Sequence, residues 1–166
     1  MSSHHRRIRL IATLSVLLCG PAWAHDGHDH PPKPVPEREA NRPTAIPDRI
    51  IRTFAGDPAR SVAVTWRTDA SVDRAIAQIA PADAGPRFAA RAKTVAARSV
   101  SLTTDLAEAR YHSVVFDDLA PSLLYCYRVG DGVNWSEWIQ VATAADKPEP
   151  FAFIYFGDAQ NDIKSL

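Results

Sequence analysis

The strongest constraint on the fold is a series of short runs between positions 48 and 145 in which apolar and polar residues alternate. The clearest run is residues 61–68, where Val62, Val64 and Trp66 share one side of an extended chain. Successive side chains of a β-strand point to opposite faces, and β-branched and aromatic residues favour strands. This run is therefore predicted to be a strand with Trp66 in the core.

Similar runs follow one another along this segment, separated by turn residues such as those at 56–58 and 130–132. The predicted strands lie at residues 49–54, 61–68, 74–80, 92–103, 111–119, 123–130 and 135–143. The run at 92–103 can hold one strand or two, and its alanines leave a helix open. About seven short strands spaced by turns predict an all-β antiparallel sandwich over residues 48–145.

Two segments of different composition precede the predicted sandwich. Residues 1–24 have a basic start, an apolar run at 10–19 and a small-x-small site ending at Ala24, the pattern of a cleaved secretory signal peptide. The apolar run is too short to span a bilayer. We therefore expect a secreted or periplasmic protein without a membrane anchor after signal removal. Residues 25–47 contain six of the 13 prolines and few apolar residues, which predicts a disordered tether.

Charge and cysteine content narrow the function classes. Removal of the signal with its three arginines leaves 16 basic residues against 19 acidic ones, a formal charge of −3. A mildly acidic chain argues against binding to nucleic acid. Cys19 lies in the signal, so Cys126 remains alone and an intramolecular disulfide is excluded. Alternation places Cys126 opposite Tyr125 and Tyr127, either covered by another domain or exposed as a surface thiol.

Histidines supply two candidate sites before any family is considered. The strip of residues 25–30 holds three imidazoles and two carboxylates, which predicts either a weak zinc, copper or nickel site or a solvated polar tail. His112 has no second metal-ligating residue near it in sequence. It is predicted to be a surface histidine or a buried one with satisfied hydrogen bonds.

The segment with Leu119, Pro121 and Tyr125 resembles the turn into the sixth strand of a fibronectin type III domain. The resemblance implies a tyrosine corner, in which the ring packs in the core and its hydroxyl bonds nearby backbone. Residues 135–138, Trp-Ser-Glu-Trp, are similar to the tryptophan–serine repeat of cytokine-receptor fibronectin domains. There, arginines of one strand stack between the tryptophans, and Arg128 and Arg110 are the candidates for this role here.

The C-terminal run differs from the strands before it. Residues 151–156, Phe-Ala-Phe-Ile-Tyr-Phe, are apolar on both faces, which suits a central strand of a sheet covered by helices on both sides. Gly157 and Asp158 follow directly. Open α/β sheets place their sites just past the carboxyl ends of such strands, so Asp158 is a candidate metal ligand. The other interpretation is a simple Gly-Asp turn.

The order of these parts resembles the purple acid phosphatases, in which a β-sandwich precedes a calcineurin-like metallophosphoesterase domain. The resemblance covers nearly all of residues 48–166 and implies that residues 149–166 begin the catalytic domain. It implies that Asp158 is a ligand of the iron in a dinuclear centre that pairs iron with zinc, manganese or iron, and that the complete protein hydrolyses phosphate esters. Gln160 stands where many relatives carry glycine or histidine, so this motif implies no second ligand.

One carboxylate cannot hold two metals, so this chain is expected to be truncated, inactive alone and free of bound metal. Without its sheet, the segment 149–166 is predicted to be disordered, folded against the sandwich, or aggregation-prone through self-association of the 151–156 strand. Two alternatives remain. One is a stand-alone fibronectin-like adhesion module on a proline-rich tether, and the other is a metal-binding protein that uses residues 25–30.

Overall fold

The computed structural model of the 166-residue chain describes residues 35–104 and 107–157. A single helical turn, α1 (Glu37–Ala40), precedes the strands, and a 3₁₀ helix, η1 (Pro86–Arg91), lies between the third and fourth strands. The strands are β1 (Asp48–Thr53), β2 (Val62–Thr68), β3 (Ile76–Pro81), β4 (Lys93–Ala96), β5 (Arg98–Thr103), β6 (Glu108–Phe116), β7 (Leu124–Gly130) and β8 (Ile139–Ala142).

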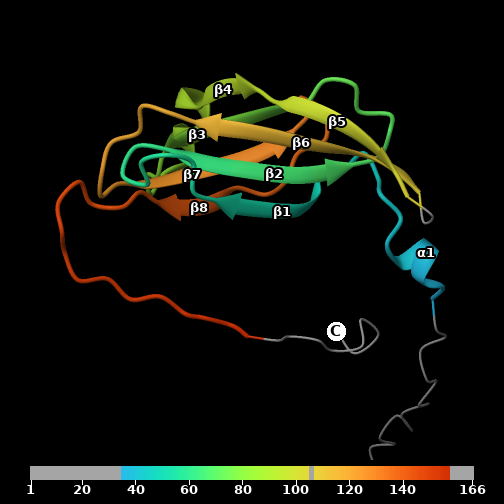
Figure 1. Ribbon diagram of the computed structural model, residues 1–166. Helices are drawn as coiled ribbons and strands as arrows, with labels where there is room; N and C mark the ends of the chain where they lie inside the picture. Colours follow the sequence, from blue (N-terminus) through green and yellow to red (C-terminus); the bar gives the residue numbers. More distant parts are fainter. Residues whose placement is uncertain (1–34, 105–106, 158–166) are drawn as a thin grey trace, which may run out of the picture. The chain divides into compact units, whose positions relative to one another are not determined.

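The strands form two four-stranded sheets that stack face to face (Figure 1). The order is β1-β2-β6-β5 in sheet A and β4-β3-β7-β8 in sheet B, and every paired neighbour is antiparallel. Sheet A has the order of the four-stranded sheet of immunoglobulin-type sandwiches, and sheet B is the opposing sheet with one added edge strand. The all-β sandwich predicted from the alternating runs is confirmed.

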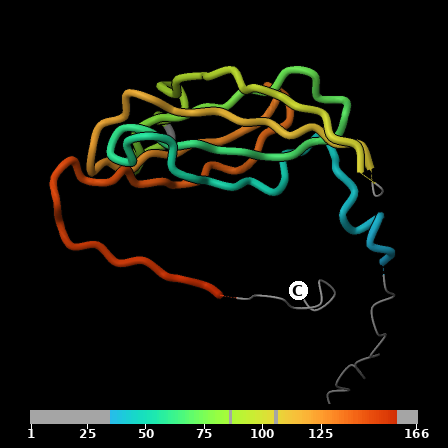
Figure 2. Tube along the Cα trace, in the orientation of Figure 1, coloured from blue at the N-terminus to red at the C-terminus, as the bar shows by residue number. Residues whose placement is uncertain are grey.

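The run at 92–103 forms two strands, and they belong to different sheets. β4 ends at Ala96 in sheet B, and β5 begins two residues later in sheet A, so that the chain crosses between the layers at Ala97 (Figure 2). The N–H of Ala97 donates to the carbonyl of Ala75 at 3.0 Å and fixes the crossing point. All six residues of β5 are exposed, Val100 and Leu102 included, so the alternation of its apolar residues does not mark a core face.

The last strand is shorter than predicted. β8 starts at Ile139, whereas Trp135 makes only an isolated bridge with Gly130. The hydroxyl of Ser136 accepts the Val129 N–H at 3.1 Å, and the Ser136 N–H donates to the Val129 carbonyl at 2.9 Å. A serine side chain thus replaces one ladder hydrogen bond, and regular pairing resumes only three residues later, at Ile139.

The core confirms the alternation of β2 and the tyrosine corner. Trp66 is 1% exposed and packs with Val64, Phe116 and Val129 between the sheets. The Tyr125 ring is buried, and its hydroxyl accepts the Ala120 N–H at 2.8 Å. A hydroxyl carried into the core is thereby satisfied by the backbone of the preceding turn.

Candidate functional site

The predicted metal ligand, Asp158, lies outside the described residues, which end at Gly157. The run before it is extended and forms no strand, and its large apolar side chains are 77–84% exposed. The run therefore does not fold against the sandwich, one of the three outcomes predicted for it. Gly157 does not have a positive φ, so its backbone conformation does not by itself demand glycine.

The described sandwich offers no alternative metal centre. Within residues 35–104 and 107–157, no group of three or more histidine, cysteine or acidic side chains is placed to hold a metal ion. The strip at residues 25–30 lies outside the described part of the chain. The donor set of the sandwich therefore does not fit a dinuclear metal centre, and any such centre has to be built from other residues.

His112 is the buried histidine with satisfied hydrogen bonds that the sequence allowed. It lies in β6 at 1% exposure, with Nε2 2.8 Å from the Thr68 hydroxyl and Nδ1 2.7 Å from the Ser99 hydroxyl. Burial, with the nearby charge of Arg110, lowers the pKa of His112 below its usual value. The imidazole is therefore held neutral between two hydroxyls, beside the Trp66 ring at 5.3 Å.

Both alternatives predicted for Cys126 are wrong. The thiol is buried by this domain itself, so it is neither a surface thiol nor dependent on a further domain for cover. In register it lies between Ala80 of β3 and Gln140 of β8 on the outer face of sheet B. Alternation alone predicted an outward side chain correctly, but it gave no sign that neighbouring strands bury this position.

Arg128 lies at the centre of a side-chain assembly on the outer face of sheet B. Its guanidinium lies 4.1 Å from the Trp135 ring centroid and 4.7 Å from that of Trp138, so the predicted stack between the two tryptophans is confirmed for this arginine. Arg110, the second candidate, instead pairs with Asp73 at 2.6 Å. A cation between two indole faces gains electrostatic attraction and planar packing at once.

The stack continues across the sheet in a way that the sequence did not suggest. The Arg128 Nε donates to the Gln78 side chain at 2.9 Å, and Gln78 donates in turn to the Thr94 hydroxyl at 3.1 Å. At the other side, Phe88 of η1 meets Trp138 edge to face at 4.9 Å. Gln78 lies directly opposite Arg128 in register, so knowledge of the β3–β7 pairing was the missing signal. We call the five side chains of Gln78, Phe88, Arg128, Trp135 and Trp138 the aromatic ladder.

Gly130 makes room for this assembly. A Cβ at this position would lie 2.2 Å from the Asn134 carbonyl oxygen and 2.8 Å from the Trp135 ring. The main chain therefore approaches the indole more closely than any side-chain-bearing residue permits. The aromatic ladder depends on this glycine as well as on the stacked groups.

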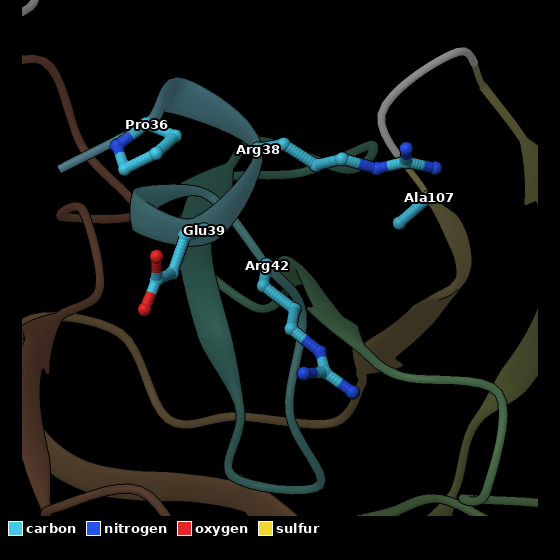
Figure 3. Close-up of a pocket in the computed structure, with 5 residues that line it drawn as sticks. All are labelled: Pro36, Arg38, Glu39, Arg42 and Ala107. Atoms are coloured by element: carbon cyan, nitrogen blue, oxygen red, sulfur yellow. The ribbon is translucent and has the colours of Figure 1, made fainter.

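A shallow, open depression of about 450 Å³ lies beside α1. It is lined by Pro36, Arg38, Glu39, Arg42 and Ala107, and the carboxylate of Glu39 points away from the two guanidinium groups (Figure 3). A cavity this open, with one short helical turn as a wall, encloses little of any ligand. The part of the chain that the structure describes contains no helix long and apolar enough to cross a membrane.

The sheet order, the tyrosine corner and the arginine stack together define a fibronectin-like β-sandwich. The family model described as "Purple acid Phosphatase, N-terminal domain" matches residues 47–143, which is the sandwich from the residue before β1 to the residue after β8. The chain belongs to this family. No curated protein matches the sequence.

Solved structures similar to this chain are fibronectin-type domains and a larger membrane protein. The fn3 domain of human contactin 1 has 15% sequence identity and a TM-score of 0.45, covering 66% of this chain and 86% of that one. The FN1–FN3 domains of chicken CNTN1 have 20% identity and a TM-score of 0.43, covering 61% and 31%. The vertebrate-specific protein Astrotactin-2 has 17% identity and a TM-score of 0.45, covering 63% and 22%.

Proposed function

We propose that this sandwich is the N-terminal domain of an exported purple-acid-phosphatase-like metallophosphoesterase, whose catalytic domain begins at about residue 149. The observation that carries the proposal is the family match over residues 47–143, followed within eight residues by an apolar run that leads to Asp158. An adhesion module has no need of such a run. The run is apolar on both faces, and its exposed side chains do not contribute to the core of the sandwich. The signal-peptide pattern of residues 1–24 supports export.

In this proposal the sandwich does not take part in the chemistry. Asp158 would supply a first carboxylate to iron, and the remaining ligands of the two-metal centre would come from residues after position 166. Two-metal hydrolysis of a phosphate ester requires both ions about 3.5–4 Å apart, one to polarise the ester and one to activate water. Residues 25–166 alone are therefore expected to be inactive.

Two experiments test the proposal. The DNA beyond the codon for Leu166 is expected to continue in frame and to encode further histidine, asparagine and aspartate metal motifs. A stop codon followed by unrelated sequence would overturn the proposal of a catalytic domain. Separately, the purified chain of residues 25–166, supplied with iron, zinc or manganese, is expected not to hydrolyse an aryl phosphate above the rate of metal alone. Hydrolysis above that rate would refute the expectation that this part is inactive.

A further inference from the structure

The point where the chain leaves the sandwich is held by several hydrogen bonds. β8 ends at Ala142, and the residues that follow meet two loops from distant parts of the sequence at the same end of the sandwich, on the left of Figure 1. We call the loops at 54–61 and 117–123, together with residues 143–146, the exit end. The far end is the opposite end of the strands, where β2 stops at Thr68 and β7 stops at Gly130.

Thr143 forms the first attachment. It is 6% exposed, and its hydroxyl donates to the Ala120 carbonyl at 2.7 Å and accepts the Leu123 N–H at 3.0 Å. Its own N–H donates to the Leu123 carbonyl at 3.1 Å. A buried hydroxyl with two backbone partners on one loop ties the end of β8 to the turn that carries the tyrosine corner.

Ala144 joins both loops through its backbone. Its N–H donates to the Pro58 carbonyl at 3.0 Å, and its carbonyl accepts the Ser122 N–H at 2.9 Å. The two loops are also joined to each other, because the Leu119 N–H donates to the Arg60 carbonyl at 3.0 Å. The loop at 54–61 is fixed in turn by Ser61, whose hydroxyl donates to the Asp57 carbonyl at 2.9 Å.

Asp146 makes the last contact, an ion pair with Arg60 at 3.6 Å. Both side chains are about half exposed, so this pair contributes at most about 1 kcal/mol. Residues 147–150, Lys-Pro-Glu-Pro, are exposed and form no regular structure. Proline fixes φ, and the five residue steps from Asp146 to Phe151 span at most about 18 Å.

We propose that the exit end is a positioning surface. The sandwich holds its outgoing chain rigidly as far as Asp146 and leaves only residues 147–150 as a flexible joint. The exit end therefore faces the folded unit that begins at Phe151. The inference rests on the proposed function for the presence and the identity of that unit. A domain of about 200 residues has a radius of gyration of about 16 Å, comparable to the full reach of the joint. The far end is about 24 Å further on, one seven-residue strand away, which exceeds the span of the joint, so the unit is attached next to the exit end.

Backbone relaxation of the ¹⁵N-labelled chain of residues 25–166 tests the proposal. Order parameters are expected to stay near 0.85 through Asp146 and to fall below about 0.6 at Glu149. Thr143→Val removes the hydroxyl, and the order parameters of residues 144–146 are expected to fall towards those of the joint while the core strands are unchanged. Thr143→Ser keeps the hydroxyl and is expected to preserve the order.

Two results would overturn the anchored exit. One is loss of order directly after Ala142 in the unmodified chain, and the other is an unchanged profile in Thr143→Val. If Thr143→Val fails to fold, the profile of the unmodified chain still decides. Arg60→Gln removes the ion pair with Asp146 and the longer one with Asp57 at 3.9 Å, and is expected to lower order at Asp146 while residues 143–145 keep theirs. All of these measurements use residues 25–166. A stop codon after Leu166 would therefore refute the phosphatase assignment and the positioning role, but would leave the test of the anchored exit unaffected.

Discussion

β2 and the run at residues 151–156 are both short and rich in residues that favour strands, yet only β2 forms a strand. β2 pairs with β1 and β6, and its inward side chains are at most 2% exposed. The later run pairs with nothing in the described chain and exposes 77–84% of its large side chains. β2 alternates, so it suits a sheet with one buried face, whereas the later run needs cover on both faces. Strand propensity therefore selects a conformation, and the pattern of faces selects the kind of sheet.

The sharpest test of this difference compares one aromatic residue from each run. Trp66→Ala leaves a large cavity between the sheets and is expected to lower the free energy of unfolding by about 3–5 kcal/mol. Phe153→Ala removes an exposed ring and is expected to change it by less than about 0.5 kcal/mol. Urea unfolding followed by circular dichroism measures both. Equal effects of the two substitutions would show that the runs do not differ as described.

Substitutions in the aromatic ladder test whether side chains on the outer face of sheet B also stabilise the fold. Arg128→Ala removes two cation–π contacts and the bond to Gln78, and the expected loss is about 1–3 kcal/mol of unfolding free energy. Arg128→Lys keeps the charge but not the planar guanidinium, so most of the loss is expected to remain. Urea unfolding of the two variants decides the point. A lysine variant as stable as the parent chain would mean that charge alone matters.

His112 is expected to make the stability of the core depend on pH. The pKa of His112 is lowered in the folded state by burial and by Arg110, so the unfolded chain binds the proton more tightly. Stability is therefore expected to be complete above the unfolded pKa of about 6.5 and to fall as pH decreases below it, by up to about 1.4 kcal/mol per pH unit. Urea midpoints from pH 7.5 to 5 in the parent chain and in His112→Gln measure this. A slope that His112→Gln leaves unchanged would assign it to other groups.

The sequence allowed the sandwich to be predicted because each strand repeats a local rule. Alternation placed Trp66 inside, and the resemblance of the segment with Leu119, Pro121 and Tyr125 to a fibronectin turn implied the corner. The sequence did not reveal which distant segments pair with each other. The bond from Arg128 to Gln78 spans 50 residues, and the burial of Cys126 depends on neighbours in β3 and β8.

The candidate site was less predictable than the fold for the same reason. Asp158 was identified from one strand end, yet a metal centre needs ligands from several segments that only a complete sheet brings together. The exit end also escaped prediction, since Thr143 and Pro58 are ordinary residues in sequence and acquire their roles only when two loops meet. Local patterns thus identify elements, whereas sites and attachments depend on register and on contacts between loops.

Removal of residues 149–166 is the smallest expected change in stability and the most direct test of the comparison. The described part of the deleted segment, residues 149–157, contains the exposed apolar run and no hydrogen bond that holds the exit end, so the unfolding free energy is expected to change by less than about 0.5 kcal/mol. Solubility is expected to increase, because an unpaired strand-forming run promotes association between chains. Light scattering against concentration measures association, and a variant with Phe153 and Tyr155 both replaced by Ser tests whether the apolar rings are responsible. An unchanged solubility in both variants would mean that the run, although exposed, does not cause self-association.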